Sequence, residues 1–146
     1  MLPRFAVTLV ALLVGPWAAL AEPAAVPPDL DCKLGFDALR NWSAWLPGAK
    51  QKTANPNVVT LEDPDVWRVE ITFTEPGQPA HPAIVLRKFV KQVTGVWTAQ
   101  SKECGYGNQA EYIALVDAMK AEDSRLTNAS RDEVERLKRE QSPLGQ

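Results

Sequence analysis

Two cysteines, Cys32 and Cys104, are the residues of this sequence with the clearest potential for chemistry. In an oxidising compartment, an even pair of cysteines more often forms a disulfide than persists as two thiols. A bond between them would close a loop of about 70 residues, which is worth roughly 4 kcal/mol in lost freedom of the unfolded chain. We therefore predict a Cys32–Cys104 disulfide that ties the start of the fold to its late middle.

Cys104 also has a second interpretation, as a nucleophile. It lies in the segment Lys-Glu-Cys-Gly-Tyr-Gly, where Lys102 and the two glycines could lower a thiol pKa. This alternative would make the protein a hydrolase or a redox enzyme that uses Cys104. No histidine is near in sequence to activate the thiol, and a partner cysteine is present, so the disulfide is favoured.

Three other side chains are candidates for binding a partner. Tyr106 lies between two glycines next to the predicted disulfide, in the kind of anchored loop that often presents binding residues. His81 is the only histidine, in a proline-rich loop, so a site built from several histidines is excluded within one chain. Trp97 is expected on a strand, where an aromatic side chain either enters the core or forms a binding surface.

Acidic residues cluster at 62–65, but their neighbours are typical of a turn. A Ca²⁺ site on Glu62, Asp63 and Asp65 would lack the spacing of a known calcium loop. The sequence also has no phosphate-binding glycine loop, no zinc-protease helix and no Cys-x-x-Cys motif. We therefore predict no metal, no cofactor and no catalytic residue.

The N-terminus has the pattern of a secretory signal peptide over residues 1–21. One basic residue, Arg4, precedes an apolar run that is broken by Gly15-Pro16 and followed by Ala-Leu-Ala. The apolar run is too short for a membrane-spanning helix. We expect cleavage after Ala21, export to the periplasm or the exterior, and no membrane insertion afterwards. Residues 22–28, rich in proline and alanine, are expected to be an extended lead-in.

Composition places the chain among ordinary globular proteins, with 45% apolar and 23% charged residues. Its formal charge is −2, and loss of the signal peptide removes one further positive charge. Nucleic acid binding usually requires an excess of positive charge. We therefore exclude nucleic acid as a partner.

Hydrophobic periodicity predicts a helix over residues 33–46 and a run of strands after it. The clearest strand begins at Trp67, where apolar and polar residues alternate strictly. Residues 83–93 fit a helix or a strand. We favour a strand because Thr94-Gly95 would turn it into the next one, with a bulge near Arg87-Lys88. The strands are expected over residues 58–61, 67–74, 83–93 and 96–104, with surface loop over 49–57.

Asn108 is expected to cap a helix with Tyr112, Leu115 and Met119 on its apolar face. A separate peripheral helix is predicted from Ser130, where Ser130 and Glu133 form a capping box. The resulting fold class is α+β, with about four antiparallel strands and the two terminal helices packed on one face. The globular domain is expected over residues 29–127, followed by a polar helix or tail over residues 128–146.

These features favour a small exported protein that is not an enzyme and that binds a protein or ligand in the cell envelope or periplasm. Two alternatives stay open. One is the enzyme that uses Cys104, and the other is a purely structural accessory subunit.

Overall fold

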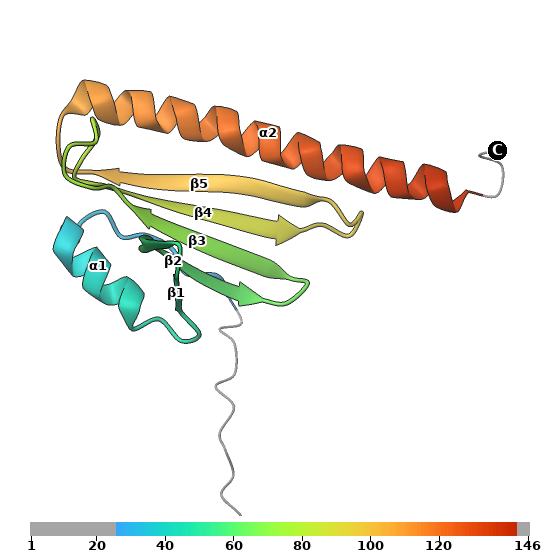
Figure 1. Ribbon diagram of the computed structural model, residues 1–146, viewed down its shortest axis with the longest axis horizontal. Helices are drawn as coiled ribbons and strands as arrows, with labels where there is room; N and C mark the ends of the chain where they lie inside the picture. The colour runs from blue at the N-terminus through green and yellow to red at the C-terminus, as the bar shows by residue number, and fades with distance from the viewer. Residues whose placement is uncertain (1–25, 143–146) are drawn as a thin grey trace, which may run out of the picture.

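A computed structural model describes residues 26–142 (Figure 1). The predicted signal peptide and the first residues of the predicted lead-in lie outside the described residues. Seven elements follow in chain order: α1 (Phe36–Ala44), β1 (Lys50–Lys52), β2 (Asn55–Asp63), β3 (Trp67–Phe73), β4 (Ala83–Lys91), β5 (Trp97–Gly105) and α2 (Gln109–Gln141). The fold is α+β, as predicted.

The strands form one antiparallel sheet in which neighbours in sequence are neighbours in space, in the order β1-β2-β3-β4-β5. The prediction of about four strands was one short. Residues 49–57, predicted as surface loop, contain β1 and the start of β2. All three residues of β1 are exposed, so this strand has no apolar side that a sequence pattern could indicate.

β3 is confirmed as the strand with strict alternation, since every second residue from Trp67 is buried. β4 is confirmed as a strand, but the predicted bulge at Arg87-Lys88 is wrong, because the pairing of β4 with both neighbours is continuous there. The broken alternation has another cause. The first four residues of β4 are all buried, so both sides of the strand are covered at this point and the sequence does not alternate.

One side of the sheet, here called the α1 face, contains the main core. Strand register places Ile71, Leu86 and Cys104 on this face together with the other apolar residues of β3. α1 packs against it through Leu39, which is 1% exposed, and through the Phe36 ring. Burying a leucine side chain in this way contributes about 1.5–3 kcal/mol. The helix stops before Pro47-Gly48, where Gly48 has a φ of 78°.

α2 is one continuous helix, so the prediction of a separate helix starting at Ser130 is wrong. Asn108 caps it as predicted, its side chain accepting a hydrogen bond from Glu111 N at 3.1 Å. Ser130 does not act as a cap. Its hydroxyl accepts from the backbone N–H of Trp97 at 2.9 Å, and this tertiary bond replaces the local one that the capping box would use.

α2 covers the outer edge of β5, and the two run side by side in Figure 1. Besides Ser130, Thr127 accepts from Ala99 N at 3.0 Å and Asp123 accepts from Ser101 N at 2.6 Å. Steps of four and three residues along the helix thus match alternate residues along the strand. Side chains therefore satisfy backbone donors that an unpaired edge strand would expose.

The predicted packing of both helices on one face is wrong. Arg87 of β4 projects from the face opposite the α1 face, and it reaches α2 through an ion pair with Asp123 at 2.8 Å. α2 therefore lies along β5 and over the adjoining part of this second face. No residue of α2 is buried, because the helix follows an edge instead of crossing the sheet. Among the described residues, no helix is both long enough and apolar enough to cross a membrane.

Candidate functional site: the disulfide end and the open face of the sheet

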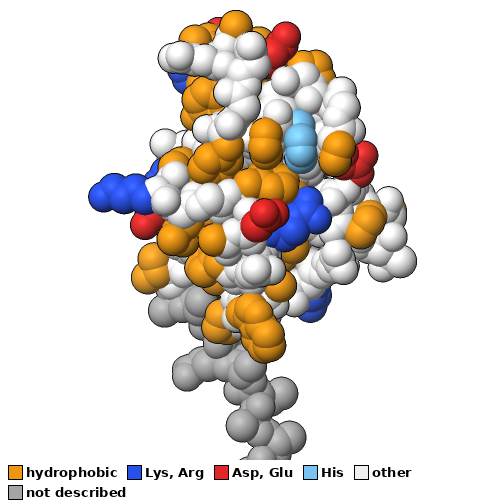
Figure 2. Space-filling view, turned by 90° about the vertical axis from the view of Figure 1, so that its left-hand side faces the viewer, with side chains coloured by type: hydrophobic (Ala, Val, Ile, Leu, Met, Phe, Trp, Pro, Cys, Tyr) orange, Lys and Arg blue, Asp and Glu red, His pale blue; other side chains and the backbone are white. Residues whose placement is uncertain are grey.

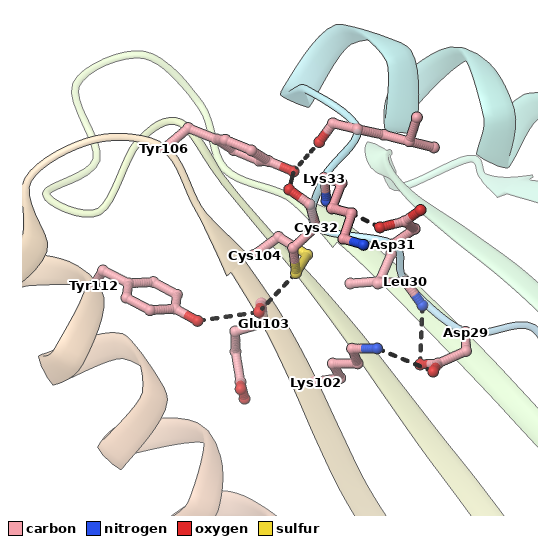
Figure 3. The surroundings of a disulfide bond; sticks show 11 residues. Asp29, Leu30, Asp31, Cys32, Lys33, Lys102, Glu103, Cys104, Tyr106 and Tyr112 are labelled. Carbon is pink, nitrogen blue, oxygen red and sulfur yellow. Dashed lines mark hydrogen bonds and ion pairs between the residues drawn. A yellow bond between two sulfur atoms is a disulfide. The ribbon is translucent and has the colours of Figure 1, made fainter.

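The predicted disulfide joins the segment before α1 to the end of β5 (Figure 3). The Cα atoms of Cys32 and Cys104 are 5.3 Å apart, within the range that a disulfide requires. Asp29 adds an ion pair with Lys102 at 3.0 Å, and this pair lowers the pKa of the Asp29 carboxyl. Leu30 between these links is 2% exposed and belongs to the core. The segment is therefore fastened to the sheet by covalent, ionic and apolar contacts.

Tyr106 lies beside the disulfide and is directed at the chain's own backbone (Figure 3). Its hydroxyl donates to the carbonyl oxygens of Leu34 and Cys32, the latter at 3.3 Å. Burial raises the pKa of Tyr106, and the charge of Asp31 raises it further. The polar end of this candidate residue is thus occupied within the protein, although 36% of the side chain is exposed.

His81 lies at the same end of the molecule, which Figure 2 views directly, with the histidine ring flanked by hydrophobic side chains. Its Nδ1 is 3.1 Å from both the hydroxyl and the carbonyl oxygen of Thr74. The Phe36 ring meets the imidazole edge-on, with 5.4 Å between centroids. A cis peptide bond follows His81, and Pro82 O accepts from Tyr106 N at 2.9 Å. These contacts shape a loop that brings His81 and Tyr106 to one end.

Cys104 is 1% exposed, and its sulfur is bonded to Cys32. A nucleophile must present a free thiolate to its substrate. The observed geometry thus favours a structural role for this cysteine over the enzymatic alternative.

Trp97 lies at the other end of β5, away from His81 and Tyr106, in a cluster of rings and cations. The Arg68 guanidinium is 4.5 Å from the centroid of the Phe89 ring and 5.4 Å from that of Trp97. Lys91 Nζ is 5.8 Å from the Trp97 ring. The rings of Phe89 and Trp97 are only half-buried. The three predicted binding residues therefore do not form one site.

The cluster borders a groove of about 610 Å³ on the side of the sheet opposite the α1 face. We call the part of this side formed by β1–β4 the open face. Strand register places on it the groove residues Lys50, Thr60, Glu62, Arg68, Glu70 and Phe89. Lys52 joins them through an ion pair with Glu70 at 2.8 Å. The groove exists because α2 lies along the β5 edge and over Arg87, and does not cover the groove residues of β1, β2 and β3.

Trp97 was predicted from the sequence as a binding residue, whereas Arg68, Phe89 and Lys50 were not. A signal for Arg68 was present, since it occupies the polar side of the strand with strict alternation. That pattern indicates only exposure, however, and the stacking on Phe89 depends on strand register. Register could not be determined while residues 83–93 also fitted a helix.

The described residues contain no group of three or more side chains that could hold a metal ion. Glu62 and Asp63 are consecutive residues of β2, so their side chains point to opposite faces of the sheet. The acidic residues considered for a Ca²⁺ site are therefore separated.

Comparison of the chain with protein-family models, curated proteins and solved structures gave no match.

Proposed function

We propose that this protein is an exported binding protein without catalytic activity, and that it docks a partner protein of the cell envelope on its open face. The observation that supports this proposal is the groove of about 610 Å³ with a stacked arginine at its side. Binding sites are typically concave, with rings for contact area and a few placed polar groups for orientation. The open face has each of these features.

Charge favours an acidic segment as the occupant. Lys50, Lys52 and Arg68 line the groove with Glu62 and Glu70, so cations are in excess there while the whole chain carries −2. An acidic segment would be attracted to the groove more than to the rest of the surface. Export is supported by the signal-like N-terminus and by a cysteine pair at disulfide distance.

The disulfide end supports the alternative functions less well. Its tyrosine and histidine have intramolecular partners, and its cysteines are bonded to each other. A purely structural accessory subunit remains the second candidate. A binding protein should make a specific contact through one defined surface, whereas a purely structural subunit should not.

Site-specific photocrosslinking in the native host distinguishes them. The photoreactive residue benzoylphenylalanine is placed at Thr60 in the groove or, as the matched control, at exposed Ala38 on α1. We expect a discrete protein adduct from Thr60 and none from Ala38. Mass spectrometry of the same protein should give an N-terminus at Glu22, as expected after export. No adduct at Thr60, or the same adducts from both positions, would overturn the proposal.

A further inference from the structure

Arg68 is held in place by aromatic rings, and its donor groups are left free. It lies on β3 directly between Glu62 on β2 and Phe89 on β4. The guanidinium stacks on Phe89 at 4.5 Å and makes no ion pair with Glu62. Within residues 26–142, its side chain donates no hydrogen bond to another residue. Stacking therefore orients the guanidinium without using its N–H groups.

The surroundings set the charge that a ligand should carry. Lys52 and Glu70 neutralise each other at 2.8 Å. Of the other charged side chains that line the groove, Lys50 and Arg68 are cationic and Glu62 is anionic. The remaining charge is close to one positive unit, which matches a single negative charge. A doubly charged phosphate would exceed this charge and would be repelled by Glu62.

We propose that Arg68 binds a carboxylate of the partner and that the rings of Phe89 and Trp97 contact an apolar side chain next to that carboxylate. This inference rests on the proposed function and specifies the chemistry of its site. A guanidinium offers a planar fork of donors that matches the two oxygens of a carboxylate. A free C-terminus with an aromatic or aliphatic last residue has this arrangement of groups.

The test uses two small probes, N-acetylphenylalanine and its C-terminal amide, which differ only in the carboxylate. Binding is followed by ¹⁵N NMR on the protein isolated after export, through the Arg68 Nε–H and Trp97 indole N–H signals. We expect the acid to shift both signals and to bind about tenfold more tightly than the amide, since hydrogen bonds to charged groups have this order of strength.

Two matched variants complete the test. Arg68→Lys keeps the charge but loses the planar fork, so affinity for the acid should fall about fivefold to tenfold. Arg125→Lys on the exposed side of α2 should leave affinity unchanged. The variants are compared only after their spectra show the same folded sheet. Equal binding of acid and amide, no binding of either, or full affinity in Arg68→Lys would overturn the inference.

The two proposals can fail separately. If an adduct forms at Thr60 but the acid and the amide bind equally, docking on the open face would be supported, and carboxylate binding by Arg68 would be contradicted. If the acid binds tightly at Arg68 but no protein adduct forms, the carboxylate site would be supported, and docking of a partner protein would be contradicted.

Discussion

Asp123 connects α2 to both β4 and β5. It accepts hydrogen bonds from the backbone and the hydroxyl of Ser101 at 2.6 and 2.8 Å, and it pairs with Arg87 at 2.8 Å. Asp123→Ala should lower the free energy of unfolding by roughly 2 kcal/mol, because hydrogen bonds to a charged group are lost and Arg87 stays partly buried. Urea denaturation measures this value. Glu122→Ala, which breaks only an exposed pair, is the control and should have little effect.

Glu103 should make stability depend on pH. Burial raises the pKa of its carboxyl, Asp123 raises it further, and Lys120 and Arg87 partly oppose this rise. Above the ordinary carboxyl pKa the folded state thus binds more protons than the unfolded state, so its stability falls as the pH rises through that range.

Glu103→Gln should consequently stabilise the protein at about pH 7 and lose most of that advantage at about pH 4, where the carboxyl is mostly protonated in both states. Denaturation curves of the two proteins at both pH values test this. A gain that is the same at both pH values would show that Glu103 is not responsible.

At the scale of elements, α2 has a part that covers the sheet edge and a part that extends past it. The covering part includes Thr127 and Ser130, whereas residues 135–141 are all exposed. Truncation after Val134 should keep the melting temperature and the association state of the parent protein. Truncation after Leu126 uncovers the N–H groups of Ala99 and Trp97, so it should cause self-association through the β5 edge. Light scattering distinguishes the two, and a short form that associates no more than the parent protein would contradict the assigned role of α2.

The elements also show what the sequence could predict. Strict alternation predicted β3, Asn108 predicted the start of α2, and Thr94-Gly95 predicted the β4–β5 turn, because each signal is local. β1 and the unbroken course of α2 were missed. β1 is held by its pairing with β2 and by the ion pair of Lys52 with Glu70 on β3, and Ser130 bonds to Trp97 across the fold, so neither has a signature within its own segment. Cys32 and Cys104 could be paired although they are far apart in sequence, because the chain has only two cysteines, whereas the contact of Arg68 with Phe89 depends on strand register.

The whole molecule depends on the disulfide to hold the segment before α1 on the sheet. Cys32→Ser should cost roughly 4 kcal/mol by the chain-entropy argument, a sizeable part of the stability of a small domain. We expect the melting temperature to fall by at least several degrees, and wild-type protein in reductant to behave like the variant. Reductant should not change Cys32→Ser itself. An unchanged melting temperature after complete reduction would contradict this account of the fold.

The central claim is that the open face, with Arg68 beside its groove, is where a partner docks. The yield of the adduct formed from benzoylphenylalanine at Thr60 tests it most directly, when compared between the parent protein, Arg68→Gln and Arg125→Gln. We expect a strong loss of adduct in Arg68→Gln and the parental yield in Arg125→Gln, since only the first variant removes a charge from the groove. Equal adduct yields in all three proteins would contradict the claim.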